Sequence, residues 1–307
     1  MRGLTPLSLA FPFSDYVVYA KLRHITGGGI YSMSDQVTDW GIDNDYGVLR
    51  DVLLGKPDYF KWVEAGPLIG RTLKNMHKTG VSFDFELAQQ QHREMVRIYE
   101  EAGVTRHYLE SDPVLHRNFF ARDSSAMTPW GALICHMQLK CRRADYYTTI
   151  KFYQEHDIPI WRYATAGHFE GGDFVILEPG SVLIGYCGER SEQEGAEQVA
   201  EFVRAEGWDV EVAPIPALFV HMDGLVVPLD HKLLVACLDA LEGWVIDWLR
   251  NKGFEFVDVG FAEAKDLGVN LVSPVSYTHL RAHETSDDIS YAVFCLKIGG
   301  GGGGGGG

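Results

Sequence analysis

The chain has 307 residues, of which 46% are hydrophobic and 12% aromatic, and its net charge is −15. This composition supplies a core and excludes an intrinsically disordered chain. The negative charge argues against a nucleic-acid partner, because nucleic-acid-binding surfaces are basic. Five cysteines without the spacing of a disulfide framework indicate a reducing compartment, so we expect a cytoplasmic protein.

Residues 1–32 differ from the rest of the chain. They start with an apolar run that Pro6, Pro12 and Asp15 interrupt, and they lack the small-residue cleavage site of a signal peptide. The run is too broken for a membrane span, so we expect no membrane partner. We expect 1–32 to be a disordered or non-native extension, with Met33 as the initiator of a domain over 33–273.

The first ordered elements follow in that domain. Residues 46–57 read as a strand that Pro57 ends, because proline cannot continue a central ladder. Apolar residues at helical spacing predict a helix over 83–102, and Gly103 is a natural stop. A further strand is expected over 104–109.

Three aspartates at equal spacings of 50 residues, Asp123, Asp173 and Asp223, each precede a similar stretch of chain. Each is followed by two apolar runs joined by a turn, then by a helical pattern and another strand. The unit is therefore strand–turn–strand–helix–strand. The expected helices cover 141–156, 191–206 and 242–252, and the expected closing strands cover 158–163, 209–213 and 254–259.

Such a repeat predicts an α/β fold in which several units pack around a common axis, since one unit cannot bury its apolar faces alone. Residues 46–109 read as a degenerate first unit, and a fifth begins near 270–273 and stays incomplete. The acidic residues that open the hairpins should converge near the axis.

Residues 274–307 break the pattern. They end in a glycine run over 299–307, which has no side chains to bury. The string VSYTHLRAHET resembles translated sequencing-adapter DNA. We expect this segment to be an artefactual, disordered tail, and the natural protein to be truncated inside its last unit.

The residues expected at the axis suit a small, planar cation such as a guanidinium. Carboxylate pairs bind its N–H groups bidentately, and a histidine can pass a proton to a leaving amine. A metal-dependent hydrolase is the alternative, although no compact ligand motif occurs. Each aspartate alone can also be a turn cap, and each histidine a structural residue. These candidates are Asp123, His168, Glu170, Asp173, His221 and Asp223.

The order FARD (120–123), FEGGD (169–173) and HMD (221–223) resembles the guanidine-modifying (pentein) superfamily. Its members include arginine deiminase, dimethylarginine dimethylaminohydrolase and the amidinotransferases. The resemblance covers about 46–273 and implies a five-bladed α/β propeller. It also implies hydrolysis of a guanidino C–N bond through a covalent cysteine intermediate, without a cofactor or a metal.

The resemblance also implies residue roles. Asp123 and Glu170 bind the guanidinium nitrogens, and His221 is the general acid and base. Asp223 orients the substrate or His221, and Arg190 holds the substrate carboxylate. Asp173, also placed at the substrate, is chiefly structural. The substrate is a small guanidino compound, arginine or a methylated arginine, and the resemblance leaves open whether the protein is a homodimer.

The nucleophilic cysteine is where this chain departs from the family pattern. In the family it lies near the C-terminus in a glycine-rich segment, and Cys295 in AVFCLKI does not match that setting. None of Cys135, Cys141, Cys187 and Cys237 occupies the family position. We therefore expect this chain as written to be inactive. An amidinotransferase and a non-catalytic guanidinium-binding protein remain the alternatives.

Overall fold

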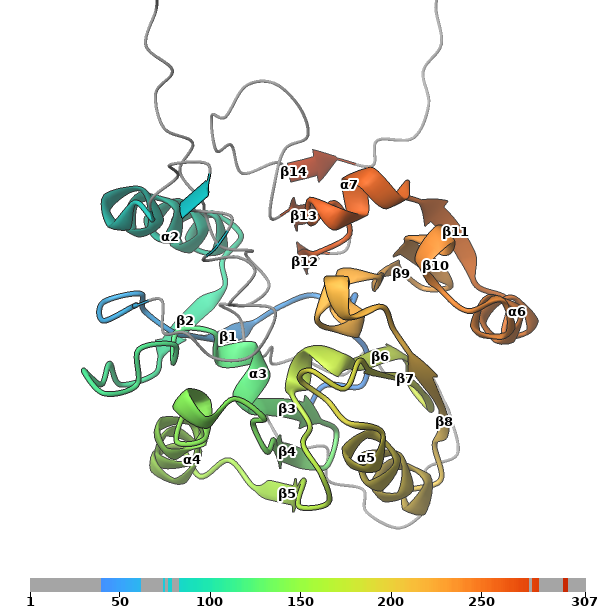
Figure 1. Cartoon of the computed structure of the whole chain (residues 1–307), viewed down its shortest axis with the longest axis horizontal. Coiled ribbons are helices and arrows are strands. Elements are labelled where there is room, and N and C mark those ends of the chain that lie inside the picture. The colour runs from blue at the N-terminus through green and yellow to red at the C-terminus, as the bar shows by residue number, and fades with distance from the viewer. Residues whose placement is uncertain are drawn as a thin grey trace, which may run out of the picture.

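The computed structural model describes residues 40–61, 74, 77–78, 83–275, 278–281 and 295–297. Within them, short strands form five small sheets, and helices lie outside the sheets around a common centre (Figure 1). The fold is thus mixed α/β, as the repeat predicts. The expected 1–32 extension lies outside the described residues.

Three consecutive units share one plan. In each, the middle strand pairs antiparallel with the first strand and parallel with the third, which follows a helix. This confirms the ββαβ repeat. The units are β3 (Ser125–Thr128), β4 (Gly131–Ile134), α4 (Tyr146–Glu155) and β5 (Ile160–Tyr163); β6 (Phe174–Glu178), β7 (Ser181–Tyr186), α5 (Gln193–Ala205) and β8 (Asp209–Pro214); and β9 (Val226–Asp230), β10 (Leu233–Ala236), α6 (Gly243–Asn251) and β11 (Glu255–Asp258).

The first and last parts of the chain lie beside each other. Strand β1 (Asp51–Leu54) pairs in parallel with β2 (Thr105–Tyr108) across α2 (Phe85–Glu101). Leu267 and Val272, which come late in the described chain, pack against the apolar cluster that these elements form. The last elements are α7 (Phe261–Lys265) and the sheet of β12 (Leu271–Val275), β13 (Thr278–Arg281) and β14 (Cys295–Lys297).

Local chemistry accounts for the element ends. The Asp84 side chain caps α2 by accepting from the Leu87 backbone N–H at 2.9 Å. Helices α2, α5 and α6 all end just before a glycine with positive φ: Gly103, Gly207 and Gly253. A left-handed residue after the helix is the usual stop, and glycine adopts it without a steric cost.

The strand expected over 46–57 is shorter in the structure. Residues before β1 leave the line of that strand. Asp45 pairs with Ile176 in β6, which belongs to the third unit. Its backbone N–H donates to the Ile176 carbonyl at 3.2 Å, and its Oδ2 accepts from the Ile176 N–H at 3.1 Å. This segment therefore joins β6 instead of lengthening β1.

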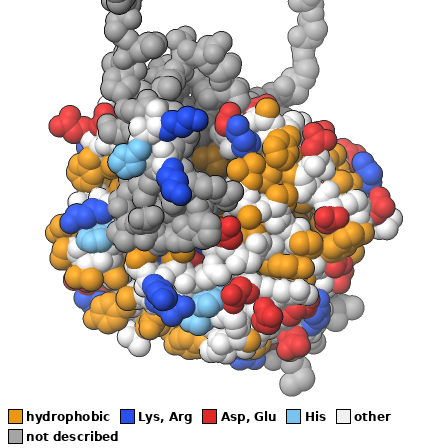
Figure 2. Space-filling model, viewed as in Figure 1, with side chains coloured by type: hydrophobic (Ala, Val, Ile, Leu, Met, Phe, Trp, Pro, Cys, Tyr) orange, Lys and Arg blue, Asp and Glu red, His pale blue; other side chains and the backbone are white. Residues whose placement is uncertain are grey.

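The described part of 274–307, which the sequence predicts to be disordered, consists of the end of β12 and of strands β13 and β14. The other residues of that segment lie outside the described residues. No helix among the described residues is both long and apolar enough to span a bilayer. On the face in Figure 2, basic side chains are scattered among acidic and hydrophobic ones and form no continuous stripe.

Candidate active site

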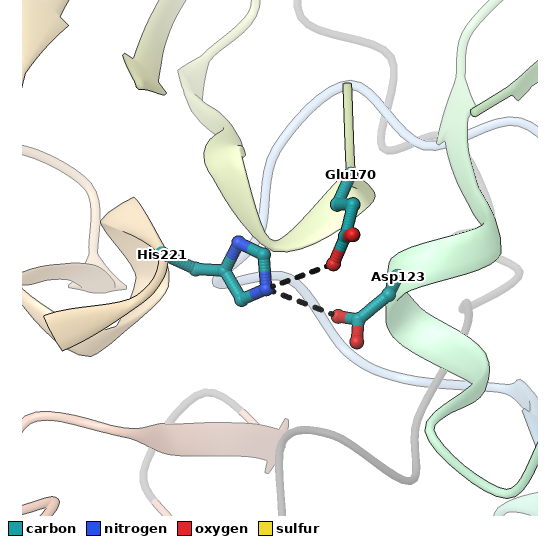
Figure 3. Close-up of side chains that lie close together, drawn as sticks. All are labelled: Asp123, Glu170 and His221. Atoms are coloured by element: carbon teal, nitrogen blue, oxygen red, sulfur yellow. Dashed lines mark ion pairs between the residues drawn. The ribbon is translucent and has the colours of Figure 1, made fainter. Parts of the chain in front are cut away.

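Three turns that open the hairpins meet at the centre of the sheets. They are α3 (Ala121–Ser124), η3 (Gly171–Asp173) and η5 (Met222–Gly224), and η3 contacts both of the others. They bring together Asp123, Glu170 and His221 (Figure 3). His221 Nε2 lies 3.4 Å from Glu170 Oε2 and 3.6 Å from Asp123 Oδ1. These are ion-pair distances, longer than good hydrogen bonds. The convergence expected from the repeat is thus confirmed.

The two carboxylates at this centre are buried and incompletely paired. Asp123 is 4% exposed and Glu170 is 0% exposed. Asp123 Oδ1 and both carboxylate oxygens of Glu170 have no hydrogen-bond partner. A buried acceptor without a donor costs free energy, so such atoms mark a place where a donor-rich ligand fits.

His221 is held by Asp173. The imidazole Nδ1 lies 2.9 Å from Asp173 Oδ2, while Asp173 Oδ1 accepts from the Met222 backbone N–H at 2.9 Å. Burial alone would lower the pKa of His221, but Asp173 and then Asp123 raise it well above 6.5. The imidazole is therefore cationic at neutral pH, with its Nε2–H directed at the two carboxylates.

Two buried arginines surround the carboxylates. Arg190, which the resemblance assigns to the substrate carboxylate, is 6% exposed, and its NH1 lies 3.5 Å from Glu170 Oε2. Arg142 NH1 pairs closely with Asp123 and lies 4.0 Å from Glu170 Oε2. Its Nε donates to Asp145 at 2.8 Å. Sequence reasoning missed Arg142, although it follows its hairpin much as Arg190 follows the next one.

These cations set the protonation state of Glu170. Burial alone would raise its pKa, but Arg190 in particular, with His221 and Arg142, lowers it to about 2. Glu170 is therefore ionised across the physiological range. A carboxylate in this state accepts hydrogen bonds and donates none, as a guanidinium ligand requires.

The structure places Asp223 and Asp173 beside different partners. Asp223 Oδ2 faces Arg122 Nε at 3.4 Å, whereas the partner of the His221 ring is Asp173. Burial raises the pKa of Asp223 to about 6, against the opposing effect of Arg122. The reason is a geometric one. Asp223 lies two residues after His221 on the same turn, while Asp173 reaches the ring from the neighbouring unit.

His168 lies at the edge of the site, away from the central carboxylates. Its Nδ1 is 2.8 Å from Glu192 Oε2, and its Nε2 is 3.2 Å from Arg143 NH2. Since the arginine can only donate, Nε2 accepts, and the proton of the neutral ring is on Nδ1. These contacts join the loops that carry Arg142 and Arg190.

Two glycines allow the turns to pack this closely. A Cβ atom on Gly172 would lie 2.8 Å from Cγ of His221. A Cβ atom on Gly185 would lie 2.7 Å from Oδ1 of Asp173. The His221 imidazole thus packs directly against the backbone of Gly172, and the Asp173 carboxylate packs against the backbone of Gly185.

A metal ion is the other ligand that this cluster could hold. One ligand atom from each of Asp123, Glu170 and His221 lies within 4.8 Å of the others. A metal ligand must be neutral imidazole, so a metal ion would have to displace the proton that Asp173 and Asp123 favour on His221. The N–H groups of a planar organic cation can instead donate to the carboxylate oxygens while His221 keeps its proton.

Two described cysteines near the site, Cys135 and Cys187, are not activated thiolates. Burial, then Glu170 and Asp123, raises the pKa of Cys135 well above its ordinary value. Burial and then Asp173 raise the pKa of Cys187, whose thiol donates to the Val220 carbonyl at 3.3 Å. A nucleophilic cysteine needs a lowered pKa, so neither is suited to attack a substrate.

Comparison with known proteins agrees with this geometry. Solved structures with a similar fold include dimethylarginine dimethylaminohydrolase from Pseudomonas aeruginosa in complex with citrulline (TM-score 0.59, 18% identity, covering 76% of this chain and 83% of that one). The N-terminal domain of ArgZ, a cyanobacterial arginine dihydrolase, gives a TM-score of 0.61 at 18% identity, covering 72% and 80%. SxtG, an amidinotransferase from Microseira wollei, gives 0.60 at 14%, covering 77% and 83%.

At these identities the structures show a shared fold alone. No curated protein matches the chain. The family model for arginine deiminase, however, matches residues 58–273, which is well over half of the chain. The chain therefore belongs to the arginine deiminase family, within the guanidine-modifying superfamily.

Proposed function

We propose that the protein hydrolyses a C–N bond of an unmethylated guanidino compound, converting arginine and water to citrulline and ammonia. The observation that carries this proposal is the group of buried carboxylate oxygens on Asp123 and Glu170 that accept no hydrogen bond, although cations lie within ion-pair distance of two of them. A guanidinium is the cation whose planar N–H groups match such oxygens bidentately. We also propose that the five sheets form a five-bladed propeller, supported by the contact between the first and last parts of the chain.

The placement of the donors favours arginine over a methylated arginine. Three buried oxygens on two different residues accept no hydrogen bond. A guanidinium carries five N–H groups on all its edges, whereas dimethylation of one nitrogen leaves three and removes both donors from that nitrogen. Any oxygen left without a donor would keep its desolvation cost.

Each of the described site residues has its own role in the proposed reaction. Asp123 and Glu170 hold the guanidinium and polarise its central carbon toward a nucleophile. The His221 imidazolium supplies the Nε2 proton to the departing ammonia, while Asp173 keeps the ring in place. Arg190 orients Glu170 and has further N–H groups for the substrate carboxylate.

Resemblance to the family implies a covalent intermediate on a cysteine, which water then hydrolyses. We assign that role to none of the described cysteines in the core. Cys135 and Cys187 are protonated, and Cys237 is buried in the apolar cluster around β9 and β10. The proposal for these residues therefore concerns substrate binding and proton transfer.

Calorimetry tests the binding part of the proposal. Arginine should bind more tightly than N,N-dimethylarginine, and Glu170→Gln should weaken arginine binding roughly 10- to 100-fold, the loss of one or two charge-assisted hydrogen bonds. Glu178→Gln is the matched control, since Glu178 pairs with Lys232 outside the site. Arginine binding no stronger than that of lysine would contradict the proposal.

Assays of citrulline release test the chemical part. Citrulline formation that is insensitive to EDTA supports the hydrolase and excludes the metal-dependent alternative. Tight arginine binding without citrulline would instead leave a guanidinium-binding protein. The fold shared with the amidinotransferase SxtG makes transfer the second candidate. Formation of an amidinated product with an added acceptor amine would identify it.

A further inference from the structure

The backbone immediately before His221 adopts a rare conformation. Val220 has φ 67° and ψ −53°, and the His221 N–H donates to the Phe219 carbonyl at 2.7 Å. Together these define a γ-turn centred on Val220, in its uncommon form with positive φ. That form is strained for any residue with a side chain, and more so for a β-branched one.

The turn lies where the three units differ. Phe120, Glu170 and Val220 are spaced by 50 residues and occupy equivalent places. Glu170 is extended, with φ −122° and ψ 143°, and its own side chain faces the site. Phe120 has φ −78° and ψ 66°, the opposite hand to Val220. After the turn at Val220, the side chain that reaches the carboxylates belongs to the next residue, His221.

Contacts on both sides hold the turn in place. The Cys187 thiol donates to the Val220 carbonyl at 3.3 Å. After the turn, the Met222 N–H donates to Asp173 at 2.9 Å. The raised pKa of Cys187 keeps its sulfur protonated and able to donate. A strained conformation persists only when its surroundings impose it, and such strain gathers at functional sites.

We propose that Val220 is a positioning residue: its strained turn, held by the Cys187 thiol, sets the direction in which His221 presents Nε2 to Asp123 and Glu170. The inference rests on the proposed function only for the identity of the substrate to which His221 gives its proton. The orientation of the ring itself can be measured without a substrate.

Substitutions at Cys187 and Val220 separate the effect of the backbone strain from the effect of the hydrogen bond between the Cys187 thiol and the Val220 carbonyl. In Cys187→Ala the strained turn loses a support and relaxes, so His221 moves away from its carboxylates. Glycine adopts positive φ without steric cost. In Cys187→Ala/Val220→Gly the turn therefore needs no support, and His221 returns. Cys187→Ser keeps a donor and should behave like the wild type.

The readouts are the NMR titration of the His221 imidazole, assigned with His221→Gln, and the affinity for arginine. In Cys187→Ala the pKa of His221 should fall and arginine should bind about tenfold more weakly, equivalent to ~1.4 kcal/mol. Adding Val220→Gly should restore both. Cys237→Ala removes another buried thiol away from the turn and should change neither.

Two results would overturn the inference. One is a wild-type His221 titration in Cys187→Ala, and the other is failure of Val220→Gly to restore that titration. Absence of arginine binding by the wild type would contradict the proposed function instead. The imidazole titration would then still decide whether the turn orients His221.

Discussion

The carboxylate of Asp173 holds both the ring and the backbone of His221's turn. Oδ2 lies 2.9 Å from the ring Nδ1, and Oδ1 accepts from the Met222 N–H at 2.9 Å. The two oxygens of Asp173 thus accept from the His221 ring and from the backbone N–H of the next residue, Met222. An imidazole fixed at Nδ1 can move only the proton on Nε2, which faces Asp123 and Glu170.

Asp173→Asn should lower the pKa of His221 and destabilise the protein by roughly 3–5 kcal/mol, the cost of removing one partner of a buried pair. An amide has a single acceptor oxygen, so its NH₂ would face one of two donors. With its main charge partner gone, burial would dominate and favour the neutral ring. NMR titration and urea denaturation measure the two effects. Asp247→Asn, at an exposed position, is the control and should change neither.

Arginine binding should release a fraction of the protons on His221, and the rings that stay protonated are those that can donate to the departing ammonia. The raised pKa of His221 depends on Asp173 and Asp123. A bound guanidinium occupies Asp123 and Glu170 and adds a like charge, so it lowers that pKa. Calorimetry in buffers of different ionisation enthalpy measures the number of protons released. Proton uptake, or heat independent of the buffer, would contradict a cationic His221 in the free protein.

Gly172→Ala should weaken arginine binding at least about tenfold, because the new Cβ would lie 2.8 Å from the His221 ring. Overpacking of this kind costs about 1–3 kcal/mol in stability. Gly243→Ala is the matched control, since nothing lies within 4 Å of its added Cβ. Binding and thermal unfolding should both be near wild type in the control. Unchanged arginine affinity in Gly172→Ala would show that the ring position is not critical.

Glu170 should make the protein sensitive to acid. Its folded pKa of about 2 lies below the ordinary value of 4.5. The folded state therefore binds fewer protons, and the stabilisation is complete above pH 4.5 and is lost as the pH falls toward 2. The loss between pH 5 and pH 3 should be on the order of 2 kcal/mol. Urea denaturation at pH 5 and pH 3 should show a smaller difference for Glu170→Gln than for the wild type.

Several features of the fold could be predicted because they depend on local patterns. Apolar periodicity located α2, α5 and α6 to within a few residues, and glycines of positive φ mark their ends. The spacing of Asp123, Asp173 and Asp223 predicted the repeat and the convergence of its hairpin turns. The family follows from the short motifs around these aspartates, and the match over 58–273 confirms it.

The sequence by itself determined the repeat unit and the residue types at the centre. Only the tertiary structure decided which groups pair. It placed Asp173 on His221, Asp223 on Arg122, and Arg142 beside Asp123. The physical reason is that the first two contacts cross between units, and the third joins a hairpin turn to the loop after its hairpin, 19 residues along the chain. Their geometry depends on backbone turns such as the one at Val220, whose positive φ no local preference of valine would predict.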